Sequence, residues 1–215
     1  MKKGALFLVF GILILCIFLI ENVSANDITN CGTGSNGLRS LPSTGNHRIM
    51  NDFSCSGIFT PIASFSGTLD GQGHKITGLT ISESNTEIGL FRTTSSATIK
   101  NLRLESISIT STGTKNIGAL IGKSINTIVE NSYVTGSITV TDNFDCYGSA
   151  GGLIGLLEST STSVVKKTFV NVNVNANHDC RPWYAVACEY DWAAIGGFIG
   201  SVVSANILNT NIENS

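Results

Sequence analysis

The segment that decides the fold reads Gly151-Gly152-Leu153-Ile154-Gly155, and close variants of it recur along the chain. The variants are Ile88-Gly89-Leu90-Phe91, Gly118-Ala119-Leu120-Ile121-Gly122 and Gly196-Gly197-Phe198-Ile199-Gly200. About a dozen residues after each copy comes a second landmark, namely Asn101, Asn131, Lys167 and Asn209. The spacing between copies grows from 29 to 34 and then 45 residues, while the internal offset stays nearly constant. Such a pattern is typical of a solenoid, in which one structural unit repeats.

The period of the side chains selects the kind of solenoid. Residues 107–110, 138–141 and 172–175 alternate between apolar and polar with period two, as strands do. No helical periodicity extends over ten or more positions. Stacked strands place Ile, Val and Leu in inward rows and Ser, Thr and Asn outside, with glycine at the tight corners. The sequence therefore predicts an all-β fold, a parallel β-helix.

Composition agrees with a single β-rich domain. The 215 residues include 13 Lys and Arg against 15 Asp and Glu, a net charge of −2, and this balance gives no basic surface for nucleic acid. Charged residues make up only 13% of the chain, whereas Gly numbers 23 and Pro 3. A helical enzyme would carry more Glu, Lys and Ala.

The first 25 residues predict a secretory signal peptide, which forms a helix. Lys2 and Lys3 precede an apolar run from Ala5 to Ile20, and small residues follow up to Ala25. The alternative is an uncleaved membrane anchor, because the run lies between typical signal and membrane-spanning lengths. Either way we expect an extracellular or cell-surface location, with membrane contact only if the segment stays uncleaved.

Two insertions, at 142–150 and 176–194, hold both tryptophans, three of the four tyrosines and Phe144. Because both leave equivalent points of stacked coils, we expect them to project side by side. Aromatic faces beside carboxylates suit a sugar, whose apolar face stacks on rings while acids accept its hydroxyl protons. The alternatives are that the rings bury one another, that the acids hold calcium, or that His178, Cys180 and Cys188 bind zinc. The candidate ligand site, without metal or cofactor, consists of Phe144, Asp145, Tyr147, Asp179, Trp183, Tyr184, Tyr190, Asp191 and Trp192.

Five cysteines remain after the signal segment, in an oxidising environment that favours disulfides. Cys31 and Cys55 flank the start of the domain as a staple. Aligning 139–146 with 173–180 places Cys146 near Cys180 and makes that pair the first choice. A local bond from Cys180 to Cys188 is the alternative, and the odd count leaves one thiol over.

Residues 65–76, followed by Gly78-Leu79-Thr80-Ile81 and Ile88-Gly89-Leu90-Phe91, resemble the opening of GLUG-motif proteins, and the later glycine segments resemble the motif itself. The resemblance covers residues 47–215. It implies a right-handed β-helix of about 4–5 coils over 61–215, preceded by an N-terminal cap at 26–60. Such proteins include bacterial adhesins, large exoproteins and the scaffold of immunoglobulin-A-cleaving metallopeptidases.

Candidate catalytic groups are few. His47, His74 and His178 are the only histidines, and none forms the paired-His zinc motif of those peptidases. No nucleophile elbow is present. Asp70 and His74 form a conceivable dyad, but we expect Asp70 to bind local backbone in the turn Asp70-Gly71-Gln72-Gly73. The sequence thus predicts no catalytic residues, with a carbohydrate-active enzyme as the less favoured reading.

The resulting expectation is a non-catalytic module that binds a glycan or a cell-surface protein. One alternative is a purely structural surface protein that self-associates through an open β-edge near residues 207–212. Another is a fragment of a larger exoprotein or metallopeptidase without its catalytic domain. Ice binding is a further alternative, because polar rows of mixed Ser, Thr and Asn are expected at Ser106/Ser108/Thr110, Ser137/Thr139/Thr141 and Asn171/Asn173/Asn175.

Overall fold

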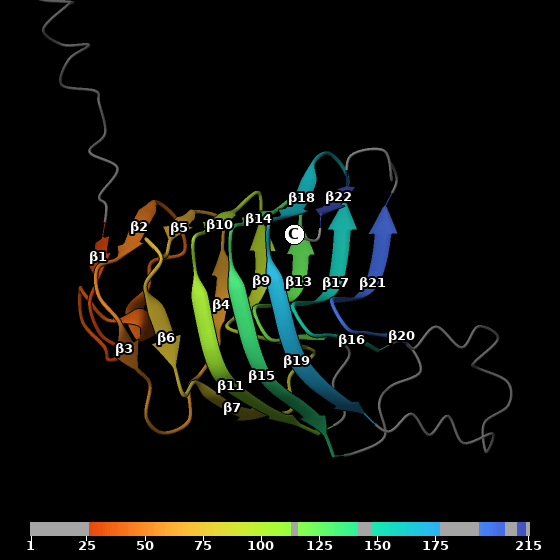
Figure 1. Cartoon of the computed structure of the whole chain (residues 1–215), viewed down its shortest axis with the longest axis horizontal. Coiled ribbons are helices and arrows are strands. Elements are labelled where there is room, and N and C mark those ends of the chain that lie inside the picture. The colour runs from red at the N-terminus through yellow and green to blue at the C-terminus, as the bar shows by residue number, and fades with distance from the viewer. Residues whose placement is uncertain (1–25, 113–115, 142–147, 177–193, 205–209, 214–215) are drawn as a thin grey trace, which may run out of the picture.

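The computed structural model shows an all-β chain whose strands pair in parallel (Figure 1). It describes residues 26–112, 116–141, 148–176, 194–204 and 210–213. Within these ranges the only helix is one 3₁₀ turn, η1 (Leu38–Ser40), and no helix is long and apolar enough to cross a membrane. The predicted signal segment 1–25 and most of both insertions lie outside the described residues.

The strands form four sheets. The seven-stranded sheet has the order β1 (Asn26–Ile28), β2 (Asn46–Ile49), β5 (Thr68–Asp70), β10 (Thr98–Lys100), β14 (Ile128–Glu130), β18 (Ser163–Lys166) and β22 (Thr210–Glu213). The six-stranded sheet contains β3 (Phe53–Ser54), β6 (Lys75–Thr77), β11 (Arg103–Ser111), β15 (Tyr133–Val140) and β19 (Phe169–Ala176), and β7 (Thr80–Glu83) also pairs with β11. The five-stranded sheet runs through β4 (Ile62–Phe65), β9 (Phe91–Ser95), β13 (Ile121–Ile125), β17 (Ile154–Ser159) and β21 (Ile199–Ser204). The four-stranded sheet contains β8 (Glu87–Ile88), β12 (Asn116–Gly118), β16 (Ser149–Gly151) and β20 (Ala194–Gly196).

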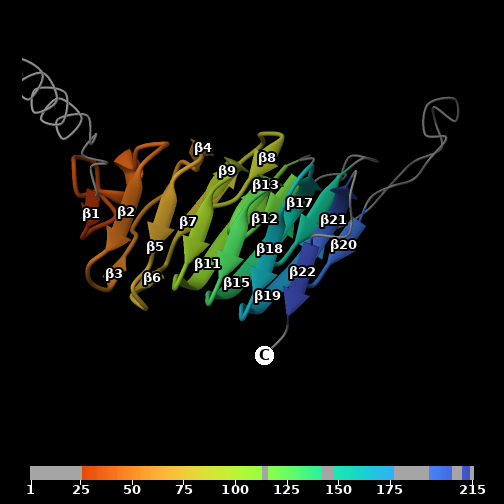
Figure 2. The same ribbon diagram turned by 90° about the horizontal axis from the view of Figure 1, so that it is seen from above.

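Neighbouring strands of a sheet come from successive passes of the chain, and Figure 2 shows them following one another along the molecule in sequence order. Ile99 of β10 pairs with Leu69 of β5 on one side and with Val129 of β14 on the other. Val165 of β18 continues this row, and all four side chains are at most 1% exposed. The expected inward rows of Ile, Val and Leu are therefore present, and their burial supplies the core.

Polar residues form matching outward rows on the six-stranded sheet. Ser108 pairs with Ser137, and Thr110 pairs with Thr139. The rows are interrupted by an irregularity between Leu104 and Ile107, where Ser106 adopts a φ of 56°. The flat, regular array that an ice-binding face needs is broken at this point.

The alignment that placed Thr139 opposite Asn173 is wrong by two residues. Thr139 pairs with Asn175 instead. Because two residues are one full period of a strand, every side chain keeps its face. The register that brought Cys146 beside Cys180 is lost, however, and both cysteines lie outside the described residues.

The glycine segments form corners at which backbones of successive passes touch. A Cβ on Gly152 would lie 2.3 Å from the carbonyl oxygen of Gly197, one pass later. A Cβ on Gly155 would lie 2.5 Å from the amide nitrogen of Ile117, one pass earlier. Side-chain carbons do not approach backbone atoms so closely, so these corners require glycine.

One outward row of the seven-stranded sheet alternates in charge from β1 to β18. Ion pairs join Arg48 to Asp27 at 2.7 Å, Lys100 to Asp70 at 3.4 Å and Lys166 to Glu130 at 2.8 Å. In register, the row reads Asp27, Arg48, Asp70, Lys100, Glu130 and Lys166. Opposite charges on directly adjacent strands favour this pairing over slipped ones.

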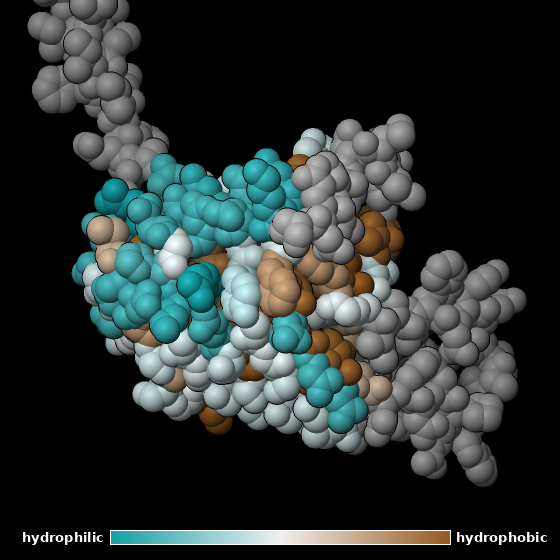
Figure 3. Space-filling model, in the orientation of Figure 1, coloured by the Kyte–Doolittle hydropathy of each residue, from teal (hydrophilic) through white to brown (hydrophobic). Residues whose placement is uncertain are grey.

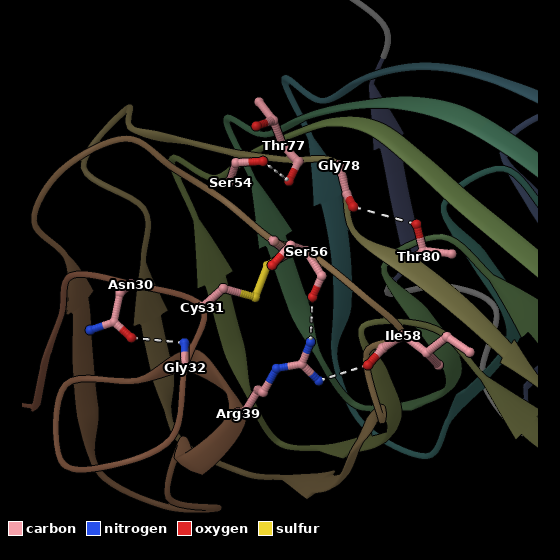
Figure 4. The surroundings of a disulfide bond; sticks show 11 residues. Asn30, Cys31, Gly32, Arg39, Ser54, Ser56, Ile58, Thr77, Gly78 and Thr80 are labelled. Carbon is pink, nitrogen blue, oxygen red and sulfur yellow. Dashed lines mark hydrogen bonds between the residues drawn. A yellow bond between two sulfur atoms is a disulfide. The ribbon is translucent and has the colours of Figure 1, made fainter.

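The segment before β4 is fastened by the disulfide that the sequence suggested, between Cys31 and Cys55 (Figure 4). Beside it, Arg39 donates hydrogen bonds to the carbonyl oxygens of Ile58 (2.9 Å) and Ser56 (3.2 Å). The Arg39 guanidinium also lies 4.8 Å from the centre of the buried Phe59 ring. A disulfide that closes a loop of this size stabilises a fold by about 3 kcal/mol.

Substitution of Gly152 by alanine should destabilise the fold, because its new methyl group would meet the Gly197 carbonyl oxygen. We expect a loss of about 1–3 kcal/mol in the free energy of unfolding, measured by urea denaturation. Gly197→Ala is the matched control: Gly197 follows the paired residues Gly151 and Gly196 as Gly152 does, but no described atom lies within 4 Å of its Cβ position. Equal losses in the two variants would contradict the role assigned to these corners.

Candidate functional site

The aromatic site predicted in the two insertions lies outside the described residues, so it stays a prediction. This applies to Phe144, Asp145, Cys146, Tyr147, Asp179, Cys180, Trp183, Tyr184, Cys188, Tyr190, Asp191 and Trp192. The described part of the chain contains a different aromatic surface, on the six-stranded sheet that faces the viewer in Figure 1. In the same orientation, Figure 3 shows mostly hydrophilic and neutral side chains, with apolar patches among the later strands.

One outward row of this sheet, which we call the aromatic row, consists of Lys75, Arg103, Tyr133 and Phe169. The Tyr133 and Phe169 rings stack with centroids 4.9 Å apart and planes 10° from parallel. The Arg103 guanidinium carbon lies 5.6 Å from the centre of the Tyr133 ring. Phe169 is 49% exposed, so this row presents an aromatic surface to solvent.

A second row, the amide row, follows the corner beside the aromatic row. Asn131 Nδ2 donates to Asn101 Oδ1 at 2.6 Å, and Asn101 Nδ2 donates to Asp70 Oδ1 at 2.9 Å. Asn101 and Asn131 have φ of 53° and 49°, a left-handed conformation that Asn tolerates better than most residues. The landmarks Asn101 and Asn131 are thus corner residues whose side chains bind each other from one pass to the next.

Lys167 occupies the equivalent corner of the next pass. It pairs with no asparagine side chain there, yet its φ is 49°, the same left-handed value. It is exposed, and it makes no ion pair with the residues that the structure describes. Lys167 is therefore a long cationic side chain at a position whose backbone favours Asn or Gly.

An open groove of about 370 Å³ lies between the two rows. Its walls include Asn101, Asn131, Arg103, Tyr133, Lys167 and Phe169. An adjoining hollow is lined by Asp70, Gln72 and the same two asparagines. Amide groups that donate and accept hydrogen bonds therefore face an apolar ring surface across one groove.

Asp70 ends the amide row and is held ionised. Burial of its side chain, which is 18% exposed, raises its pKa. Hydrogen bonds from Asn101 Nδ2 and from the Gln72 backbone N–H, with the nearby Lys100 ammonium, outweigh burial and hold the pKa below its ordinary 3.8. The bond from Gln72 N, at 2.9 Å, closes the turn that the sequence predicted here.

His74 pairs with Asp52, so the alternative of an Asp70–His74 dyad is wrong. His74 Nδ1 lies 3.1 Å from Asp52 Oδ1, which also accepts a hydrogen bond from the Lys75 backbone N–H. The Lys75 bond first, and then His74, lower the pKa of Asp52. Within the described ranges, no three His, Cys, Asp or Glu side chains gather as metal ligands would.

Sequence reasoning missed the aromatic row, because its members are not clustered along the chain. Arg103, Tyr133 and Phe169 each stand two residues after a corner landmark. That constant offset was the available signal, since equal offsets from a repeated corner place side chains in one row. Aromatic residues are neighbours along the chain in the insertions, so the sequence predicted a site there instead.

A comparison with known proteins finds a relative that matches two thirds of this chain. Halomucin of Haloquadratum walsbyi is 32% identical over 148 residues, which are 68% of this chain. The chain is similar to a part of halomucin. The match spans about 1% of the length of halomucin. No protein-family model and no solved structure matches the chain.

Replacing Asp70 by asparagine should reduce the loss of unfolding free energy that occurs when the pH is lowered. Since the pKa of Asp70 is lowered in the fold, its ionisation contributes stability that is present above 3.8 and is lost as the pH falls through the lower folded value. Asp70→Asn should therefore lose less unfolding free energy than the wild type between neutral pH and about pH 3, measured by urea denaturation. Identical losses in both proteins would contradict the assignment.

Proposed function

We propose that this chain is a non-catalytic extracellular module that binds carbohydrate through the groove between the aromatic row and the amide row. The single observation that carries this proposal is the stacked pair Tyr133–Phe169, of which Phe169 is exposed, beside the side-chain amides of Asn101 and Asn131. Sugar rings have apolar faces that stack on aromatic rings and hydroxyl groups that bind amides.

The architecture that we propose for this module is a right-handed parallel β-helix of the GLUG-motif type. Two observations support this architecture. Successive passes of the chain contribute neighbouring strands to each of the four sheets, and glycines form the corners between the strands. Connections between parallel strands of one sheet are right-handed in nearly all proteins, which supports the handedness.

Three observations support an extracellular location. The first 25 residues have the order of a secretory signal. The Cys31–Cys55 disulfide is of a kind that persists in oxidising compartments. The match to a protein whose name places it among mucins agrees with a secreted or surface protein.

The insertion residues around Trp183 and Trp192 remain a proposed second part of the binding surface.

Screening the secreted chain against a glycan array tests the proposed function. Phe169→Ala should weaken binding about tenfold by removing the exposed half of the aromatic stack. Ile58→Ala is the matched control, because Ile58 is also an exposed apolar side chain, 64% accessible, but lies far from the groove near the disulfide. A Trp183→Ala/Trp192→Ala double variant measures the part played by the insertions. Binding by Phe169→Ala that is as strong as binding by the wild type would contradict the role of the groove, and no glycan binding by a folded chain would contradict the function.

A second candidate function is structural, through self-association at the last described strands. Val202 of β21 is in register with the fully buried Leu157, yet it is 45% exposed. Among the described residues no strand pairs with the outer side of β21. An inward-facing position that is left uncovered favours contact with another copy.

The symmetry of this contact limits the form of the association. A contact between two equivalent β21 edges is closed, so we expect a dimer rather than a fibre. Sedimentation velocity over a range of concentrations should show a dimer that Val202→Asp abolishes and Ile58→Asp leaves intact. A wild-type chain that stays monomeric throughout would contradict this function.

A further inference from the structure

We infer that the groove selects acidic sugars, with Lys167 and Arg103 binding the sugar carboxylate. This inference rests on the proposed carbohydrate binding and names the class of sugar. It follows from three features of the groove: the conformation of Lys167, the charges that line the groove, and the placement of the cations beside the rings.

Lys167 occupies a corner where folding alone favours asparagine. The two preceding corners carry Asn101 and Asn131, which tolerate the left-handed backbone and bind each other at 2.6 Å. Lysine is disfavoured at a φ of 49° and cannot extend the amide row as acceptor and donor. A strained residue with no structural gain points to a role in binding.

The charges around the groove favour an anion. Its lining contains Arg103 and Lys167 and no acidic side chain. Glu105 pairs with Arg103 at 2.6 Å and neutralises part of its charge, whereas Lys167 has no described ion-pair partner. Glu130 is engaged by Lys166 in the neighbouring row. Asp70 lines only the adjoining hollow, next to Lys100.

The cations flank the stacking surface. Lys167 and Phe169 lie on either side of the buried Thr168, so both belong to the outer face of the chain and both line the groove. Arg103 lies over the Tyr133 ring, 5.6 Å from its centre, on the side away from Phe169. A pyranose packed on the exposed Phe169 ring therefore lies in a groove that both cations line, and a planar guanidinium suits a carboxylate attached to the sugar ring.

Matched ligands separate charge from stacking. Oligomers of galacturonic and glucuronic acid, each as the free acid and as its methyl ester, present the same rings with and without charge. Isothermal titration of the full secreted chain should give about tenfold tighter binding of a free acid than of its ester, and added salt should reduce this preference. Lys167→Asn should reduce the preference at least threefold, keep the affinity for the ester, and raise Tm by about 2–4 °C.

Two control variants complete the experiment. Lys167→Arg keeps the charge and should keep the preference. Lys123→Asn removes a cation from β13 on the five-stranded sheet and should also leave the preference unchanged. Equal affinities for acid and ester, or an unchanged preference in Lys167→Asn while Phe169→Ala still weakens binding, would overturn the acidic selectivity alone. If neither form of either oligomer binds, the selectivity is overturned, and the glycan array then decides whether the proposed function survives.

Discussion

The contact of backbone with backbone at the glycine corners is the constraint on which the rest of the structure depends. A side chain on Gly152 would collide with the carbonyl oxygen of the next pass, and one on Gly155 would collide with the amide of the previous pass. Every pass must therefore turn at the same place. Because the corners coincide, the strands between them stack in parallel and in register, and inward rows such as Leu69, Ile99, Val129 and Val165 become continuous.

Stacking turns residues that are distant in the sequence into neighbours, and the candidate site is a product of that geometry. Tyr133 pairs with Phe169, 36 residues later, and Asn101 binds Asn131, 30 residues later. The same principle produces the alternating charge row, in which opposite charges of adjacent passes meet. That row disfavours slipped pairings, so it holds in place the register that assembles the aromatic and amide rows on the neighbouring face.

The sequence predicts the class of fold because the glycine constraint is local and repeats visibly. It does not predict the register, because turns between corners change length. Ile125 pairs with Glu158, 33 residues on, whereas Ile128 pairs with Val164, 36 residues on. The three additional residues lie in one turn, where Asn126 Oδ1 accepts hydrogen bonds from the amides of Thr160 and Ser161. An alignment of the segments that lead into the insertions, 139–146 and 173–180, does not reveal these three additional residues. The aromatic row was missed for a related reason: its residues are dispersed in the chain and come together only through stacking.

The corner at Lys167 differs from the two preceding corners in a way that the proposed binding would explain. Asn101 and Asn131 tolerate the left-handed backbone and hydrogen-bond to each other. Asn101 also donates a hydrogen bond to the ionised Asp70 carboxylate, so the three side chains form one hydrogen-bonded row. Because this amide row is already ordered, the protein would lose little conformational entropy when it binds a ligand there. Such a scaffold tolerates the left-handed backbone of Lys167, because the strain at this corner is small beside the stacking of the strands on either side. The proposed selectivity of the groove therefore rests on a residue whose backbone conformation is unfavourable, at a cost that the stacked strands can bear.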